Sequence, residues 1–226
     1  YKVTEVSIDN PFVHLIEENI LSRESESYTV DTSYIIFTSG STGVPKGVPI
    51  SYSNILSLID EYKAFDISFG DSVAQIASLS FDASVFEFSL TFHIGATLKI
   101  FDTKVGHEHF PDFIRQNEIT HFLMTPEYYT ILDFKSCDTL KTILVGGAPY
   151  RKNESIPPQV RVLNAYGPSE CSIISSYKCM KDTTNEANIG KPISSLSYVI
   201  LNSDNRIVPD GQRGQLCITG KGMFDG

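Results

Sequence analysis

The chain has 226 residues, of which 41% are hydrophobic and 20% charged, a composition typical of soluble globular domains. Its 27 acidic and 18 basic residues give a net charge of −9, and no run of Lys or Arg occurs, which argues against a nucleic-acid-binding surface. No apolar stretch reaches the ~20 residues of a membrane span, and no signal-peptide pattern opens the chain. The 4 cysteines include no Cys-x-x-Cys pair, so we expect reduced thiols in a cytoplasmic protein.

The first 32 residues are polar and weakly patterned, and we expect 1–32 to be the N-terminal segment of a truncated α/β region. Beyond them, short apolar runs alternate with helical spacing of apolar residues. Strands and helices are predicted in the chain order strand 33–37, helix 52–65 with Ser51 as its N-cap, strand 73–77, helix 82–93, strand 96–101, helix 109–117, strand 120–124, helix 126–133, and strands 142–145 and 160–163. This alternation predicts an α/β core over 33–189, with a mostly parallel sheet covered by helices.

From residue 190 the pattern changes to short strands, predicted at 196–201, 206–208 and 215–219. Asn202-Ser-Asp-Asn205 and Pro209-Asp-Gly211 separate them and are typical turn sequences. The segment 190–226 is therefore predicted to begin a subdomain with a short antiparallel β hairpin.

A loop rich in hydroxyls and glycines follows the first predicted strand. It reads Thr38-Ser-Gly-Ser-Thr-Gly-Val-Pro-Lys-Gly47, and its backbone N–H groups, hydroxyls and single lysine suit a polyphosphate. Pro45 before Lys46 and Gly47 after it exclude a Walker A loop, and the glycine spacing excludes a dinucleotide fingerprint. A flexible serine- and glycine-rich surface loop remains the alternative interpretation.

Three further motifs lie downstream: Ser80-Phe-Asp-Ala-Ser-Val-Phe-Glu87, Asn164-Ala-Tyr-Gly-Pro-Ser-Glu170 and Gly214-Gln-Leu-Cys-Ile-Thr-Gly-Lys-Gly222. With the loop, and in the same order, they resemble the core motifs of adenylate-forming enzymes, specifically the amino-acid adenylation domains of nonribosomal peptide synthetases. The resemblance covers 33–226 and implies part of the large N-terminal region of such an enzyme. Compared with the family, the hinge and the small C-terminal domain with its lysine are missing, so we expect the isolated chain to be inactive.

The resemblance implies a nucleotide site that binds ATP and Mg²⁺. Lys46, Thr42 and Glu170 would have catalytic roles, and Glu170 would also hold the Mg²⁺ ion. Taken alone, Glu170 would be a solvated acid and Tyr166 a core residue; their shared motif favours the site. The implied nucleotide-binding residues are Thr38, Ser39, Gly40, Ser41, Thr42, Gly43, Lys46, Gly146, Gly147, Ala148, Asn164, Ala165, Tyr166, Gly167 and Ser169.

The resemblance also implies a pocket for the substrate side chain, in which Asp82 would receive the α-ammonium group. Taken alone, Asp82 at a helix start would be an N-cap. The implied substrate-binding residues are Asp82, Ala83, Phe86, Leu123, Leu144, Gly146, Ala165, Ile173 and Ile174. Apart from Asp82 they are apolar or glycine, and an unpaired buried charge is costly. We therefore expect a neutral hydrophobic amino acid of medium to large size, aliphatic before aromatic.

The implied reaction converts this amino acid and ATP-Mg to an aminoacyl-adenylate and pyrophosphate. The adenylate would then load the phosphopantetheine thiol of a peptidyl carrier domain. Neighbouring synthetase domains are expected partners, a small helper protein is a further candidate, and neither nucleic acid nor membrane is expected. Two alternatives remain: an acyl- or aryl-CoA ligase of the same superfamily, or a non-catalytic nucleotide-binding fragment.

Overall fold

The computed structural model describes residues 31–38, 45–181 and 186–224, and every structural statement below refers to them. Contacts group the residues from Asp31 onward into one compact unit. The expected segment 1–32 thus lies almost wholly outside the described residues. The division of the rest into 33–189 and 190–226 stays a prediction.

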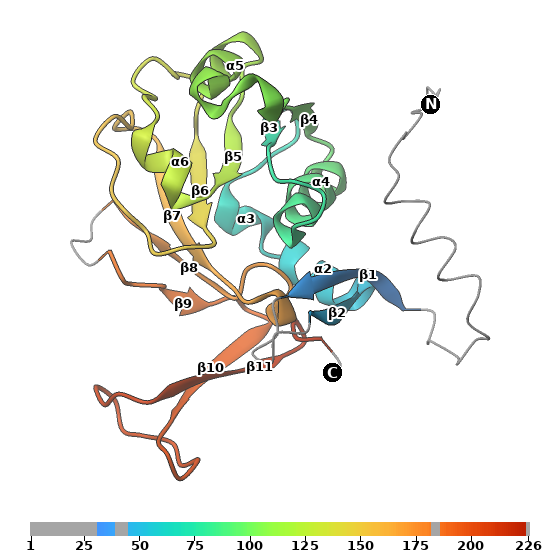
Figure 1. Ribbon diagram of the computed structural model, residues 1–226, viewed down its shortest axis with the longest axis vertical. Helices are drawn as coiled ribbons and strands as arrows, with labels where there is room; N and C mark the ends of the chain where they lie inside the picture. Colours follow the sequence, from blue (N-terminus) through green and yellow to red (C-terminus); the bar gives the residue numbers. More distant parts are fainter. Residues whose placement is uncertain (1–30, 39–44, 182–185, 225–226) are drawn as a thin grey trace. The chain divides into compact units, whose positions relative to one another are not determined.

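The main sheet has seven strands in the order β4-β3-β5-β6-β7-β8-β9 (Figure 1). The first five strands are mutually parallel, so the predicted, mostly parallel sheet is confirmed. The strand β8 pairs antiparallel with β7, and β9 pairs antiparallel with β8. The strands are β3 (Ser72–Gln75), β4 (Thr97–Ile100), β5 (His121–Met124), β6 (Thr142–Gly146), β7 (Arg161–Tyr166), β8 (Ser176–Cys179) and β9 (Lys191–Pro192). The strands β8 and β9 were not predicted, because they are short and mostly polar.

Apolar side chains leave the sheet alternately to its two faces, as the two-residue period of a strand requires. Leu123, Leu144 and Leu163 form one lateral row and belong to the first core cluster. Their chain neighbours Ile143 and Val162 lie in the row that faces the second core cluster. Both faces are therefore packed, which explains why the parallel strands read as continuous apolar runs.

Helices cover both faces of this sheet. The helix α4 (Asp82–Ile94) contributes Phe86 and Leu90 to the first cluster, whereas α5 (Phe110–Gln116) contributes Phe110 and Ile114 to the second. The helix α6 (Pro126–Ile131) also packs on the second cluster through Tyr129. Three 3₁₀ turns complete these elements: η1 (Thr103–Val105), η2 (His107–His109) and η3 (Ser169–Cys171).

The single helix predicted at 52–65 is wrong: the structure has α2 (Tyr52–Ile59) and α3 (Tyr62–Phe65). The Glu61 N–H donates to the Leu58 carbonyl at 3.0 Å, a tight turn that interrupts the helical ladder. The Glu61 carboxylate meanwhile accepts a hydrogen bond of 2.6 Å from the distant Ser194 N–H. The predicted N-cap is confirmed, since the Ser51 hydroxyl accepts from the Asn54 N–H at 3.2 Å.

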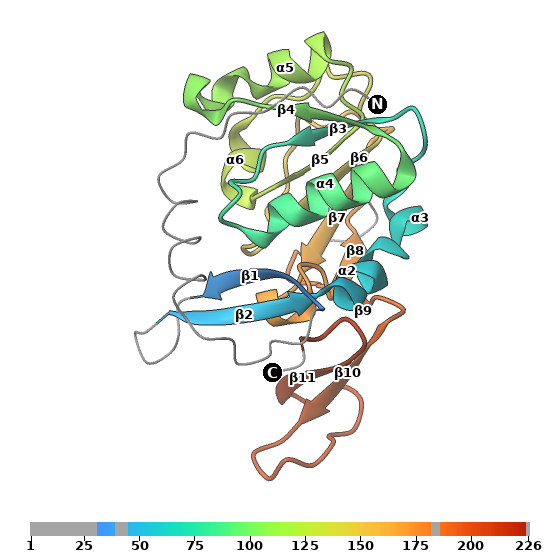
Figure 2. The same cartoon turned by 90° about the vertical axis from the view of Figure 1, so that its right-hand side faces the viewer.

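Two small antiparallel sheets complete the described unit. The strand β1 (Thr32–Thr38) pairs with β2 (Lys46–Ser51), so the hydroxyl-rich loop joins the two strands of a hairpin, beside α2 in Figure 2. The predicted hairpin of β10 (Leu196–Leu201) and β11 (Gln215–Gly220) is confirmed. The strand predicted at 206–208 is wrong, because the only pairing there is an isolated bridge between Leu201 and Ile207. Within the described ranges, none of the helices is long and apolar enough to cross a membrane.

Candidate functional site

Three of the motifs that hold predicted site residues lie where parallel strands end. The strand β6 ends at Gly146 and β7 at Tyr166, and these two strands are neighbours in register, with Gly146 opposite Ala165. The strand β3, which ends at Gln75 in the same sheet, leads to Asp82. In open α/β sheets, ligands bind at the carboxyl ends of the strands. The motifs at 80–87, 146–148 and 164–170 therefore lie at the edge where such a ligand would bind.

Glycine is required at three points of this edge. A Cβ atom on Gly146 would lie 2.9 Å from the Ala165 carbonyl oxygen, so the neighbouring strand leaves it no room. Gly147 has φ +84°, a backbone conformation that favours glycine. A Cβ atom on Gly167 would lie 2.2 Å from the Ile173 carbonyl oxygen, because the chain after β7 folds back on itself there. The exposed Gly147 and Ala148 form an open rim beyond β6.

Two polar residues implied to contact the base lie on β7. Asn164 is buried, and its Nδ2 donates a hydrogen bond of 2.9 Å to the Asn188 carbonyl. A side-chain amide has a second N–H and a carbonyl oxygen, so further hydrogen bonds remain available to it. Tyr166, at the end of the strand, is 38% exposed, and its ring is therefore open to stacking. Its carbonyl accepts hydrogen bonds from the N–H and hydroxyl of Ser175, at 2.8 and 3.0 Å.

The implied metal ligand, Glu170, lies with Ser169 in η3, and both are half-buried. Glu170 acts electrostatically on its neighbour Cys171. Burial, and to a smaller extent the negative charge of Glu170, raise the pKa of the Cys171 thiol to about 11. The described part of the chain holds no cluster of three acidic, histidine or cysteine side chains suited to a metal ion. An Mg²⁺ ion needs few protein carboxylates when phosphates and water complete its shell. Glu170 by itself therefore fits Mg²⁺ carried by a nucleotide.

The turn after Glu170 is strained. Ser172 has φ 55° and Ile173 φ 79°, and positive φ is a genuine outlier for a β-branched residue. The Ile174 N–H donates to the Ser172 carbonyl at 3.0 Å, closing a three-residue turn around Ile173. The buried Ser172 hydroxyl holds this turn by donating to the Gly222 carbonyl at 2.7 Å. Strain of this kind persists where the surroundings impose it, often at functional sites.

The structure brings most of the implied side-chain pocket together. The first core cluster contains five of its members as buried residues and Leu123 as a partly buried one. The five are Phe86, Leu144, Ala165, Ile173 and Ile174. Gly146 lies two residues after Leu144 and thus on the same face of the sheet. Ala83 is half-buried in the first turn of α4, next to Asp82.

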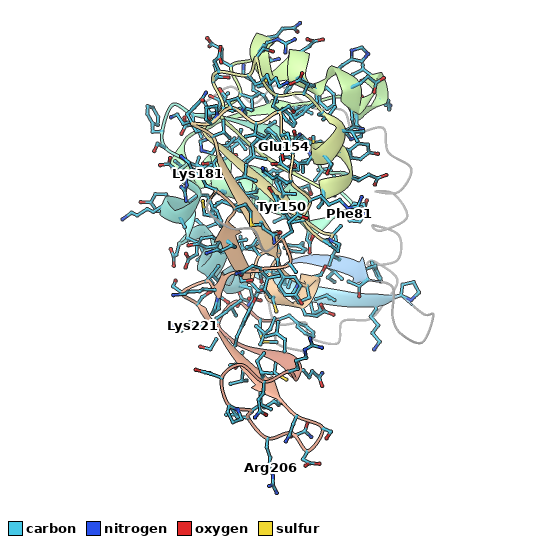
Figure 3. All side chains as sticks on the ribbon, turned by 90° about the vertical axis from the view of Figure 1, so that its left-hand side faces the viewer. Phe81, Tyr150, Glu154, Lys181, Arg206 and Lys221 are labelled. Carbon is cyan, nitrogen blue, oxygen red and sulfur yellow. The ribbon has the colours of Figure 1, made fainter. Side chains whose placement is uncertain are left out.

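Asp82 is the first residue of α4 and is half-buried. Because the N-cap of α4 is Phe81, Asp82 does not occupy the N-cap position. Phe81 is 66% exposed and is labelled in Figure 3. The side chain of Tyr34 on β1 is within electrostatic reach, since burial and then the charge of Asp82 raise its pKa. The Tyr34 hydroxyl is buried and has no hydrogen-bond partner among the described residues.

The phosphate loop itself is only partly described. Ser39, Gly40, Ser41, Thr42 and Gly43 lie outside the described residues. Thr38 and Lys46, which flank them, are paired across the end of the β1–β2 hairpin. Lys46 is exposed there. The hairpin thus fixes both ends of the loop, and the exposed Lys46 lies at one of them.

Glu87 is a residue whose importance we did not derive from the sequence, although it belongs to the motif at 80–87. It is 1% exposed and accepts hydrogen bonds from the N–H groups of Ile76 and Ala77 and from Gln75 Nε2. An acidic residue among the apolar residues of a helix was the available signal.

Comparison with known proteins agrees with these motifs. The family described as AMP-binding enzyme matches residues 8–226. Tyrocidine synthase 1 from Brevibacillus parabrevis is 32% identical over 99% of this chain and 22% of that protein. Nonribosomal peptide synthetase TES from Alternaria alternata is 33% identical over 100% of this chain and 4% of that protein. Bacitracin synthase 1 from Bacillus licheniformis is 32% identical over 100% of this chain and 4% of that protein. The chain thus spans at most about a fifth of the length of these relatives.

A solved structure has the same fold. The N-terminal subdomain of Klebsiella oxytoca NpsA, in complex with 3-hydroxybenzoyl-AMSN, superposes with a TM-score of 0.71 at 25% sequence identity. The superposition covers 94% of this chain and 59% of the NpsA chain.

Proposed function

The chain belongs to the AMP-binding enzyme family, and we propose that it forms the core of an amino-acid adenylation domain in a nonribosomal peptide synthetase. The proposed reaction joins a hydrophobic amino acid to AMP from ATP and releases pyrophosphate. The aminoacyl-adenylate would then acylate the phosphopantetheine thiol of a carrier domain. The similarity to three synthetases, each across at least 99% of this chain, supports the family part of this proposal.

One observation carries the choice of an amino acid as substrate. Asp82 is half-buried at the start of α4, in a helix whose Phe86 lies in the apolar first core cluster. A carboxylate in such surroundings needs a positive partner. Within the described chain no lysine, arginine or histidine forms an ion pair with it. A substrate α-ammonium group would be that partner.

In the proposed reaction, a substrate carboxylate oxygen attacks the α-phosphorus of ATP. The bond from that phosphorus to the bridging oxygen of the β-phosphate breaks, and pyrophosphate leaves with the electron pair. Because both reactants are anions, charge neutralisation and positioning dominate the catalysis. Lys46 would neutralise phosphate charge, Tyr166 would stack on the adenine, and Asn164 would hydrogen-bond it. Mg²⁺, held by Glu170, would supply further positive charge to the phosphates.

The nature of the pocket favours a neutral substrate side chain. Five of its members, with Leu123, gather in the apolar first core cluster, and Gly146 lies on the same face of the sheet as Leu144. A charged side chain left unpaired there would lose several kcal/mol. We propose a hydrophobic amino acid of medium to large size, aliphatic before aromatic.

A matched pair of substrates tests the proposal. ATP–pyrophosphate exchange would be measured in the full-length protein that contains this chain, with an amino acid such as leucine and with 4-methylpentanoic acid, which lacks the amino group. We expect exchange with the amino acid and at most about 1% of it with the des-amino acid, from the loss of a buried ion pair. Equal exchange with both would refute recognition of the ammonium group.

Activation of an aryl acid is the second candidate. The superposed NpsA subdomain was solved with a 3-hydroxybenzoyl compound, which favours it. Asp82 argues against an aryl-acid substrate, because a benzoate offers this carboxylate no positive partner. Including 3-hydroxybenzoate in the same assay decides between the two: exchange with benzoates alone would replace the amino-acid proposal.

A further inference from the structure

The side chain of Glu87 connects α4 to the end of β3. Its Oε1 accepts hydrogen bonds from the N–H groups of Ile76 and Ala77, at 3.1 and 3.2 Å. Its Oε2 accepts from the Ala77 N–H and from Gln75 Nε2, both at 3.2 Å. Both oxygens are therefore used, and all their donors lie in residues 75–77, directly after or at the end of the strand.

This carboxylate is an unusual choice for so buried a position. Glu87 is 1% exposed, and in the described part of the chain it has no ion-pair partner. Burial raises its pKa to about 7, although the hydrogen bonds from Ile76, Ala77 and Gln75 act in the opposite direction. Burying a charge without a counter-charge is costly. The hydrogen bonds that Glu87 accepts from main-chain N–H groups offset part of this cost.

The segment held by Glu87 leads to Asp82. Residues 78–81 are exposed, with Leu79 at 76% and Phe81 at 66%, so core packing does not fix them. These residues form a turn, in which the Phe81 N–H donates a hydrogen bond of 2.9 Å to the Ser78 carbonyl. At the far end, the Ser84 hydroxyl donates to the Phe81 carbonyl at 2.8 Å. The segment is thus fixed at its start by Glu87 and at its end by the first turn of α4.

From this arrangement we infer that Glu87 is a positioning residue for the amino-acid substrate: it holds residues 76–81 against the end of β3 and so sets the place of Asp82. Glu87 lies five residues after Asp82 in α4, on the side of the helix that faces β3. It acts through the main chain and through Asp82, not by touching the substrate. The inference rests on the proposed function, because it assigns Asp82 to the α-ammonium group.

The test compares variants of the full-length protein by ATP–pyrophosphate exchange. Glu87→Gln keeps the length of the side chain and one acceptor oxygen, whereas Glu87→Ala removes every acceptor. Glu108→Gln, at an exposed position in η2, is the matched control. We expect the KM for the amino acid to rise about tenfold in Glu87→Ala and less in Glu87→Gln, since charge-assisted hydrogen bonds are lost. The KM for ATP should stay within about twofold in both variants and in the control.

A purely structural role gives a different result. A merely destabilised protein has fewer active molecules, so kcat falls while both KM values stay at the parent's level. Unchanged KM values in a folded Glu87→Ala variant would overturn the inference. If instead the parent shows no amino-acid-dependent exchange, the proposed function itself fails, and the two failures are thereby distinguished.

Amide hydrogen exchange gives a readout that does not depend on activity. The Ile76 and Ala77 N–H groups should be protected in the parent and should exchange about tenfold or more faster in Glu87→Ala. Glu108→Gln should leave both amides protected. Unaltered protection of Ile76 and Ala77 in Glu87→Ala would show that Glu87 does not hold the segment and would also overturn the inference.

Discussion

The buried hydroxyl of Tyr34 lies within electrostatic reach of the Asp82 carboxylate, and no described residue accepts or donates a hydrogen bond to it. Burial, and after it the charge of Asp82, raises the pKa of this hydroxyl. The two residues come from different motifs, since Tyr34 lies on β1 before the phosphate loop and Asp82 begins α4. The fold thus places a hydroxyl that has no hydrogen-bond partner among the described residues near the proposed ammonium partner.

Replacing Tyr34 by phenylalanine should stabilise the protein in the absence of substrate. A buried polar group without a partner costs about 1–3 kcal/mol, and Tyr34→Phe removes it while keeping the ring. We expect the free energy of unfolding in urea to rise by about 1 kcal/mol. Tyr52→Phe, whose side chain is 59% exposed, is the control and should change little. A loss of stability in Tyr34→Phe would mean that the hydroxyl is hydrogen-bonded in solution.

Removing the charge of Asp82 should act on the amino acid and not on ATP. Loss of one partner of a buried ion pair costs about 3–5 kcal/mol, or about two to four decades in kcat/KM for the amino acid. Asp82→Asn keeps the shape of the side chain and Asp204→Asn, in an exposed turn, serves as the control. Exchange kinetics within tenfold of the parent would contradict the assigned role.

The raised pKa of Glu87 predicts a pH dependence of stability. Its folded value of about 7 exceeds the ordinary 4.5, so the folded state holds this proton more tightly than the unfolded state. Glu87 therefore lowers the free energy of unfolding as the pH rises from about 4.5 to 7, by about 3 kcal/mol in total. The loss is complete above pH 7.

Urea unfolding at several pH values checks this, because other groups titrate in the same window. Burial lowers the pKa of His121 to about 4, so His121 destabilises the fold as the pH falls. The difference between the parent and Glu87→Gln isolates the Glu87 contribution: relative to Glu87→Gln, the parent should lose stability between pH 5 and 7. Parallel pH profiles of the two proteins would show that Glu87 ionises normally.

Two glycine-to-alanine substitutions separate steric from backbone effects. A Cβ atom on Gly167 would lie 2.2 Å from the Ile173 carbonyl oxygen, whereas one on Gly211 would meet no atom within 4 Å. Gly211 has φ +84°, so alanine there costs only backbone strain, about 1 kcal/mol. Gly167→Ala should cost about 2–3 kcal/mol or more in thermal unfolding. Equal costs for the two would contradict the close approach at Gly167.

The sequence predicted the parallel sheet well because each central strand is an apolar run buried on both faces, as in Thr142–Gly146. It missed β2, whose Gly47 and Pro49 are poor strand formers, since pairing with β1 outweighs their intrinsic preference. It also missed the break after Ile59, where the distant Ser194 N–H binds Glu61. Local patterns carry no information on such tertiary contacts.

In the candidate site, too, the sequence predicted some features and missed others. Motif resemblance supplied the residues of the site, and strand register explains why Gly146 and Ala165 meet. The roles of Glu87 and Tyr34 depend on which groups lie opposite them. Glu87 finds its donors at the end of β3, whereas the Tyr34 hydroxyl finds no hydrogen-bond partner within the ranges that the structure describes. These outcomes appear only once the chain is folded.

Amino-acid-dependent ATP–pyrophosphate exchange tests the central claim most directly. It would be measured with the full-length protein that contains this chain, using all common amino acids and Asp82→Asn in parallel. The account predicts exchange with one or a few hydrophobic amino acids, above all aliphatic ones, and its loss by about two to four decades in Asp82→Asn. No exchange with any amino acid from a folded protein, or a preference for charged ones, would contradict it.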